Sequence, residues 1–150
     1  MTHILEHQSL EINHLLAYRG EITNQEMLEI EKKMEQVMKK AGAKRKGCTI
    51  KEVYRSCDHH NRFDVELLIP IDEKIEDAGE FYYREQIRIG NAVVGKHTGK
   101  ITTIDQTISA LRDYVAENNF RMTTVAYQFV KNIDVCDLDH CEIDIYVGIR

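Results

Sequence analysis

The sequence contains two halves that repeat the same order of segments. When Gly20 is aligned with Gly99, each glycine precedes a Thr-x-x-acid sequence, which runs from Thr23 to Glu26 and from Thr102 to Asp105. A threonine followed three residues later by an acid is typical of a capping box, in which both side chains bond N–H groups of a helix's first turn. Both halves therefore predict a helix that begins just after the glycine.

A second match lies near the end of each half, where residues 63–71 align with residues 141–149. Acids face acids at Asp64/Glu142 and at Glu66/Asp144, and the residues between them are apolar. This alternation with a period of two is typical of a half-buried β-strand. Two segments that match in the same order and at nearly the same offset indicate an internal duplication.

Each half is predicted to have the order strand, helix, strand, strand. The predicted first strands cover residues 13–19 and 92–98, and residues 3–12 and 80–90 lead into them. Helices follow the apolar positions of residues 27–41 and 104–115, and second strands cover residues 49–55 and 123–131. An isolated half would leave one sheet face underpacked. We therefore expect an α+β fold in which duplicated β-α-β-β units form one antiparallel sheet with two helices on one face.

The expected organisation is a single domain over residues 1–150. Repeat one occupies about residues 1–71, a polar connector residues 72–79, and repeat two about residues 80–150. A chain of this length can bury enough surface to fold without a metal or disulfide.

Composition argues against several classes of function. The net charge is -5, and the densest basic cluster, within residues 39–46, lies at a predicted helix end, where cations complement the helix dipole. The basic surface stripe expected of a nucleic-acid-binding protein is absent, so we predict no direct nucleic-acid binding. No apolar run approaches the roughly 20 residues of a membrane span, and the N-terminus lacks the order of a signal peptide. We therefore expect a cytoplasmic protein whose four cysteines are thiols.

The tips of two predicted hairpins are a candidate metal site. Cys57–His60 and Cys136–Cys141 contain residue types that bind zinc, but neither segment has Cys-x-x-Cys spacing. Tips related by a pseudo-twofold axis point in opposite directions, so one tip offers three ligands at best. We therefore predict polar turns and no metal or other cofactor, and no phosphate loop, dinucleotide fingerprint or nucleophile elbow occurs.

An aromatic and acidic set on the predicted strands is the candidate ligand site. Glu52 and Tyr54 share one face of a second strand, and Tyr127 and Phe129 hold the place that we match to them in the other half. Aromatic rings stack flat ligands, and a buried carboxylate selects a cation. A half-buried sheet surface with ordinary cross-strand pairs would carry the same residue types, so both interpretations remain open. The candidate ligand-binding residues are Glu52, Tyr54, Tyr127, Phe129, Tyr146, Tyr18 and His97.

Three segments of the second half, Asn91–Lys100, Ala126–Val130 and Glu142–Ile149, together with Ala17–Gly20 in the first half, carry a resemblance to a known family. The chain resembles the gyrase-inhibitor-like (GyrI-like) effector-binding domains, which also form the C-termini of AraC-type and MerR-type multidrug regulators of bacteria. The resemblance covers nearly the whole chain and implies a duplicated fold with a ligand groove between the halves. It also implies a stand-alone member, since the duplicated domain leaves no room for a helix-turn-helix.

One departure from the family bears on the ligand. The resemblance implies a glutamate on the second strand of the second half, where members meet cationic drugs, and the position that we match to it is Tyr127. Glu52 in the first half offers an acid from the other repeat. Three functions follow as hypotheses: a small-molecule effector-binding domain for a small aromatic or amphipathic ligand, a protein-interaction module that binds gyrase or a companion protein, and a small-molecule hydrolase. No catalytic residue is predicted, so we favour the functions that are not enzymatic.

Overall fold

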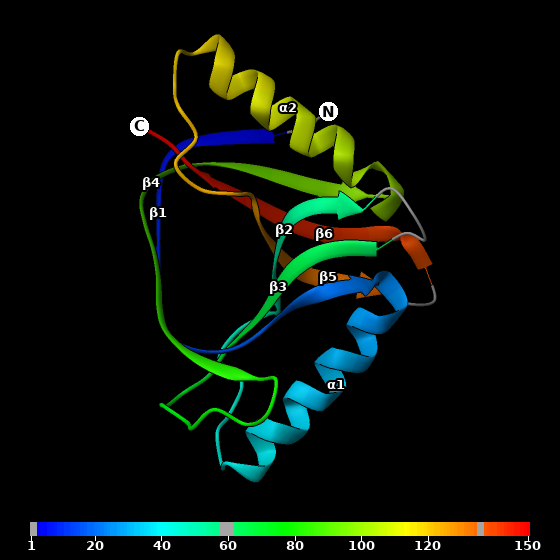
Figure 1. Ribbon diagram of the computed structural model, residues 1–150. Helices are drawn as coiled ribbons and strands as arrows, with labels where there is room; N and C mark the ends of the chain where they lie inside the picture. Colours follow the sequence, from blue (N-terminus) through cyan, green and yellow to red (C-terminus); the bar gives the residue numbers. More distant parts are fainter. Residues whose placement is uncertain (1–2, 58–61, 135–136) are drawn as a thin grey trace. The chain divides into compact units, whose positions relative to one another are not determined.

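The computed structural model describes residues 3–57, 62–134 and 137–150 (Figure 1). The chain divides into two compact units: a first unit of Glu11–Ile87 and a second unit of Met1–Leu10 with Arg88–Arg150. Strands β1 (His3–Thr23) and β4 (Tyr82–Gly99) each contribute residues to both units. The two units are therefore not identical with the two sequence repeats.

In the first unit, β1 is followed by α1 (Asn24–Lys40), β2 (Ile50–Cys57) and β3 (Arg62–Pro70). Strand β3 lies in the middle, because it pairs antiparallel with both β1 and β2. One face of this ladder packs against α1, whose apolar stripe follows helical spacing. The buried core includes Met34 and Met38 from α1, and Val65, Leu67 and Ile69 from β3.

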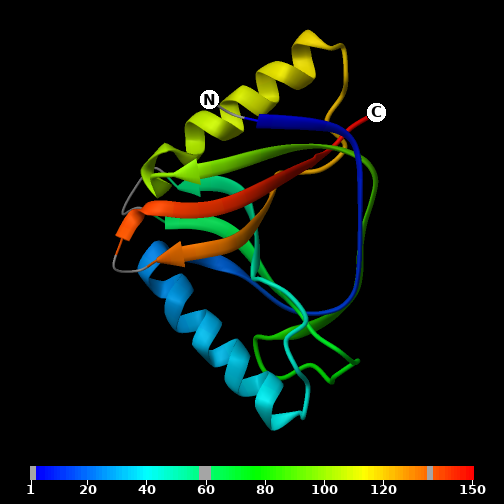
Figure 2. The same ribbon diagram turned by 180° about the vertical axis from the view of Figure 1, so that it is seen from behind.

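The second unit repeats the same order. Strand β4 is followed by a 3-10 turn (Ile101–Thr103), α2 (Ile104–Glu117), β5 (Tyr127–Asp134) and β6 (Asp137–Gly148), as Figure 2 shows from behind. Strand β6 is the middle strand, paired antiparallel with β4 and β5. Its core includes Leu111 and Val115 from α2, Val93 from β4, and Ile143 and Ile145 from β6.

The predicted α+β class and the duplicated strand-helix-strand-strand order are confirmed. Helix α1 ends two residues before Gly42, whose φ of 77° is the left-handed conformation that glycine adopts readily. Helix α2 covers the predicted apolar positions and ends before Asn118. The single-domain organisation with its connector at residues 72–79 stays a prediction.

The predicted capping box is confirmed in the first repeat only. Thr23 Oγ1 accepts a hydrogen bond from the N–H of Glu26 at 3.1 Å, and Glu26 Oε1 accepts one from the N–H of Thr23 at 3.1 Å. In the second repeat the prediction for Thr102 and Asp105 is wrong, because the 3-10 turn occupies residues 101–103. Helix α2 therefore begins without a side-chain cap, and Thr103 Oγ1 donates to the carbonyl of Lys100 instead.

The predicted starts of three strands are wrong. Residues 3–12 and 82–90 are not lead-in segments, since they form the first parts of β1 and β4. In β4 the alternation is carried by Ile87 and Ile89, which are buried between exposed neighbours, and two residues give only a short signal. Strand β5 begins at Tyr127 rather than at Thr123, because Thr124 Oγ1 accepts a hydrogen bond from the N–H of Gly148 ahead of the ladder. In the part of the chain that the structure describes, no helix is long and apolar enough to cross a membrane.

Candidate functional site

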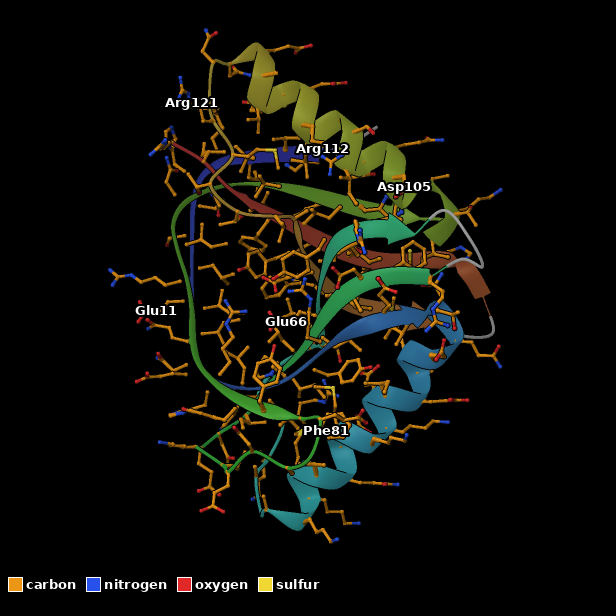
Figure 3. All side chains as sticks on the ribbon, in the orientation of Figure 1. Glu11, Glu66, Phe81, Asp105, Arg112 and Arg121 are labelled. Atoms are coloured by element: carbon orange, nitrogen blue, oxygen red, sulfur yellow. The ribbon has the colours of Figure 1, made fainter. Side chains whose placement is uncertain are left out.

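Two buried carboxyl groups lie opposite each other on neighbouring strands of the first unit. Glu52 in β2 and Glu66 in β3 are direct cross-strand partners, and their exposed fractions are 1% and 6%. Val65 and Leu67 face the core under α1, so Glu66 projects to the other face of β3, where Figure 3 labels it. Like charges directly opposite each other are destabilising, so this acid pair requires compensating groups.

The acid pair forms ion pairs with one arginine and accepts hydrogen bonds from two tyrosine hydroxyls. Arg84 Nη1 lies 2.6 Å from Glu66 Oε1 and 3.6 Å from Glu52 Oε2. The hydroxyl of Tyr82 donates to Glu66 Oε2, and the hydroxyl of Tyr54 donates to Glu52 Oε2 at 3.1 Å. Tyr82 and Arg84 are two residues apart in β4, so the pleat directs both side chains to the same acid. We call Glu52, Glu66, Tyr54, Tyr82 and Arg84 the acid-pair cluster.

A second ion pair borders the acid-pair cluster. Arg19 in β1 binds Asp64 in β3 through two hydrogen bonds of 3.0 and 3.1 Å. Its guanidinium carbon also lies 3.6 Å from the centroid of the Tyr54 ring, which is a cation–π geometry. Tyr54 is 40% exposed, so one aromatic ring of the cluster lies at the surface.

The electrostatics of the cluster favour one ionised acid and neutral phenols. Burial raises the pKa of Glu66. Hydrogen bonds from Glu52 and Tyr82 and the charge of Arg84 lower it by more than burial raises it, so the pKa of Glu66 lies below its usual range. Burial and the nearby carboxyl groups raise the pKa of Tyr54 to about 12, and burial and Glu66 raise that of Tyr82. Both phenols are therefore hydrogen-bond donors near pH 7, which suits binding better than proton abstraction.

Every buried polar side chain in the described part of the chain has a hydrogen-bond partner. The acid-pair cluster is therefore satisfied by the chain's own groups. A ligand that binds to it has to replace at least one of these internal hydrogen bonds.

Three of the predicted site residues lie together in the second unit. Tyr127 in β5 is the cross-strand partner of Tyr146 in β6, and the ring centroids of Phe129 and Tyr146 are 4.9 Å apart. Tyr127 and Phe129 are 7% and 8% exposed, so most of this aromatic group is covered. Its role in ligand binding stays a prediction.

The other two predicted residues have structural contacts of their own. Tyr18 belongs to the core under α1 and packs against Phe81 with ring centroids 5.9 Å apart. His97 Nδ1 lies 2.7 Å from Thr107 Oγ1, and its Nε2 lies 2.8 Å from the carbonyl of Lys100. Both ring nitrogens of His97 are thus bonded to the turn and helix that follow β4. The structure does not bring Tyr18 to the acid pair.

The strand register corrects the match that the sequence suggests between the repeats. Glu52 pairs with Glu66 in the first unit, and Phe129 pairs with Asp144 in the second. Since Glu66 and Asp144 hold equivalent places in β3 and β6, the counterpart of Glu52 is Phe129 and not Tyr127. The two-residue error arose because the helices and loops between the anchors differ in length.

Sequence reasoning missed three members of the acid-pair cluster: Glu66, Tyr82 and Arg84. Glu66 carried no separate signal, because an acid between Val65 and Leu67 fits the alternation of a half-buried strand. Tyr82 and Arg84 lay in a segment interpreted as a lead-in, so their period-two spacing was not used.

The predicted polar hairpin tips lie largely outside the described residues, which include neither 58–61 nor Cys136. Among the described residues, His140 is exposed, and Cys141 is buried with its thiol donating to the carbonyl of Gly99. No group of three or more His, Cys, Asp or Glu side chains that could hold a metal ion occurs in the described ranges.

No protein-family model and no curated protein matches the sequence. Solved structures do match the fold. In a cryo-EM structure of an EcmrR–DNA complex, the similarity has a TM-score of 0.80 at 13% identity and covers 100% of this chain and 57% of EcmrR. This chain thus spans little more than half the length of EcmrR. The crystal structure of the EcmrR C-terminal domain matches with a TM-score of 0.73 at 16% identity, covering 96% of this chain and 98% of that domain.

A hydrolase from Listeria innocua has the same fold, with a TM-score of 0.63 at 11% identity over 99% of this chain and 91% of that protein. Identities this low show a shared fold and carry no activity with them. At the level of the fold, the chain is similar to the C-terminal domain of EcmrR.

Proposed function

We propose that this chain is a small-molecule effector-binding domain and that the acid-pair cluster holds the charged end of its ligand. The observation that carries this proposal is the position of Glu52 and Glu66, two acids opposite each other with almost no exposure. The fold shared with the EcmrR C-terminal domain supports a binding role of this kind.

Burying two acids is costly, so their presence favours a function. A buried charge loses its hydration, and even a well-paired buried ion pair is often no more stabilising than apolar residues of the same volume. In the second unit the place of Glu52 is taken by the aromatic Phe129, so the same fold forms without an acid there. Buried, mutually perturbed titratable groups are common at functional sites.

The chemistry of the cluster indicates the class of ligand. The acids attract a positive charge, and the exposed ring of Tyr54 already accepts a guanidinium on its face. A ligand that combines a cation with an aromatic or apolar body would use both features. As part of a regulator, such a domain would report the presence of the ligand to a DNA-binding partner.

Titration calorimetry with tetraphenylphosphonium, a lipophilic cation, tests the proposal. Glu66→Gln should weaken binding about tenfold or more, since the loss of a partly desolvated charge interaction is worth about 1.4 kcal/mol or more. The matched control is Asp144→Asn, which removes the equivalent acid of the second repeat, bonded there to Lys131 at 2.8 Å. That variant should bind like the wild type.

Equal affinity of the wild type and Glu66→Gln would refute the proposed site. Weakening by Asp144→Asn alone would place the ligand in the second unit instead. Circular dichroism of each variant checks that a loss of affinity does not reflect unfolding.

A further inference from the structure

Arg84 holds the acid pair from the side that solvent reaches. Its side chain is 31% exposed, whereas those of Glu66 and Glu52 are 7% and 1% exposed. The Arg84 side chain, which contacts both acids, is thus more accessible to solvent than either of them. Arg84 is therefore the member of these two ion pairs that solvent reaches.

The charge of Arg84 is required as long as no ligand is bound. Glu66 is the ionised acid of the pair and accepts a hydrogen bond from Glu52, and the guanidinium of Arg84 supplies the positive charge beside it. The neighbouring cation, Arg19, is bound to Asp64 through both hydrogen bonds of its fork, so it is already engaged. Arg84 therefore supplies the positive charge and the N–H donors that an external cation would supply.

The contacts of Arg84 with the two acids are side-chain contacts, so they can break while the backbone of β4 stays in place. The side chain projects from β4, and its contacts with the two acids are made by its terminal guanidinium nitrogen. An arginine side chain loses rotamer entropy when it is held in one geometry, and it regains this entropy when it is released into water. Tyr82 would stay on Glu66, since its hydroxyl bonds the other carboxylate oxygen.

We propose that Arg84 is an internal competitor for the effector site, and that the ligands which replace it best are planar guanidinium or amidinium cations with an aromatic or apolar body. This inference rests on the proposed function of the acid-pair cluster. Planar cations of this type match the fork geometry of carboxylates and donate two N–H bonds, as the Arg84 guanidinium does. The aromatic body would cover the ring of Tyr54. Arg84 is then a specificity-determining residue, because a cation without N–H donors cannot replace all of its bonds.

The test measures the affinity of two probes for the wild type and for Arg84→Ala by titration calorimetry. Benzamidine is an aryl amidinium, and tetraphenylphosphonium is a cation without N–H donors. If Arg84 fills the site in about 90–99% of molecules, removing it should strengthen benzamidine binding about 10- to 100-fold. Tetraphenylphosphonium binding should gain less, and Arg84→Ala/Glu66→Gln should lose the gain for benzamidine. Lys131→Ala, which removes the cation from Asp144 in the other repeat, is the matched control and should bind benzamidine like the wild type.

A measurement on the wild type covers the case in which Arg84→Ala does not fold. The NMR signal of the Arg84 Nε–H group is assigned with the variant Arg84→Lys. It should move toward the signal of free arginine as benzamidine is titrated, and it should stay in place when neither probe is added. Benzamidine binding with an unmoved Arg84 signal, or weaker benzamidine binding to folded Arg84→Ala, would overturn the inference. If the wild type and Arg84→Ala both bind tetraphenylphosphonium but not benzamidine, planar guanidinium or amidinium cations are not the preferred ligands. These results differ from failure of the proposed function itself, in which Glu66→Gln changes the affinity of neither probe.

Discussion

Replacing Gly95 with alanine tests how α2 packs on β4 in the second unit. A Cβ atom at position 95 would lie 2.8 Å from Leu111 Cδ1 and 2.9 Å from Leu111 Cγ. Leu111 is fully buried at 0% exposure, so its side chain has no open space to move into. The positive-φ glycines are Gly42, Gly79 and Gly99, so alanine at position 95 meets no backbone strain and its cost is steric.

The size of the effect follows from two opposing contributions. Overpacking a filled core by one methyl group costs about 1–3 kcal/mol of unfolding free energy. Alanine also restricts the unfolded chain, which returns about 0.4–1 kcal/mol. The middle of each range leaves a net loss of about 1.3 kcal/mol, which lowers the Tm of a chain of this length by about 3–5 °C.

Urea denaturation followed by far-ultraviolet circular dichroism measures this loss. The control is Gly90→Ala on the same strand, where an added Cβ meets nothing within 4 Å, and its stability should be unchanged or slightly higher. The double variant Gly95→Ala/Leu111→Ala should be about as stable as Leu111→Ala alone, because the new methyl group then fills part of the cavity. If Gly95→Ala is as stable as Gly90→Ala, the close contact between α2 and β4 is wrong.

Three further predictions follow from the hydrogen bonds and pKa values. Thr23→Ala should lower the unfolding free energy in urea by about 1 kcal/mol, because it removes the capping box with Glu26, whereas Thr103→Ala should change it by less than about 0.5 kcal/mol. The pKa of Glu66 is lower in the folded protein than in the unfolded chain, where it is about 4.3. The stabilisation from its ionised form is therefore present above the unfolded pKa and is lost as the pH falls through the folded pKa. The difference in unfolding free energy between wild type and Glu66→Gln should shrink as the pH is lowered from about 5, and a constant difference would contradict this. Burial raises the pKa of the Cys141 thiol, so iodoacetamide should alkylate it at least about a hundredfold more slowly in native than in urea-unfolded protein, as peptide mass spectrometry would measure.

The order of the helices and strands could be predicted from the sequence because the same segment pattern occurs in both repeats, so each element was indicated twice. The apolar stripe of α1, its capping box and the stop at Gly42 all agree, and such agreement between local signals is what makes a segment predictable. The first parts of β1 and β4 were missed for the opposite reason. Their strand-forming residues are few and are separated by charged and polar ones, so the alternation is short, and tertiary pairing decides the conformation.

The candidate site was predictable only in part. Glu52 and Tyr54 were found, since an acid and an aromatic residue two apart in a strand share a face. Glu66 lies opposite Glu52 through strand register, which an alignment of the two halves cannot give when the loops differ in length. Arg84 lies in β4, 18 residues farther along the chain than Glu66, and no local pattern predicts such a contact.

The central claim is that the acid-pair cluster binds the charged end of a small-molecule ligand. Titration of tetraphenylphosphonium into protein with 13C-labelled tyrosines, assigned by single Tyr→Phe variants, tests it most directly, because the chain has seven tyrosines distributed over both units. The ring signals of Tyr54 and Tyr82 should shift with one common Kd, and these shifts should be lost in Glu66→Gln. Saturable binding that shifts the rings of Tyr127 and Tyr146 but leaves those of Tyr54 and Tyr82 in place would contradict the account.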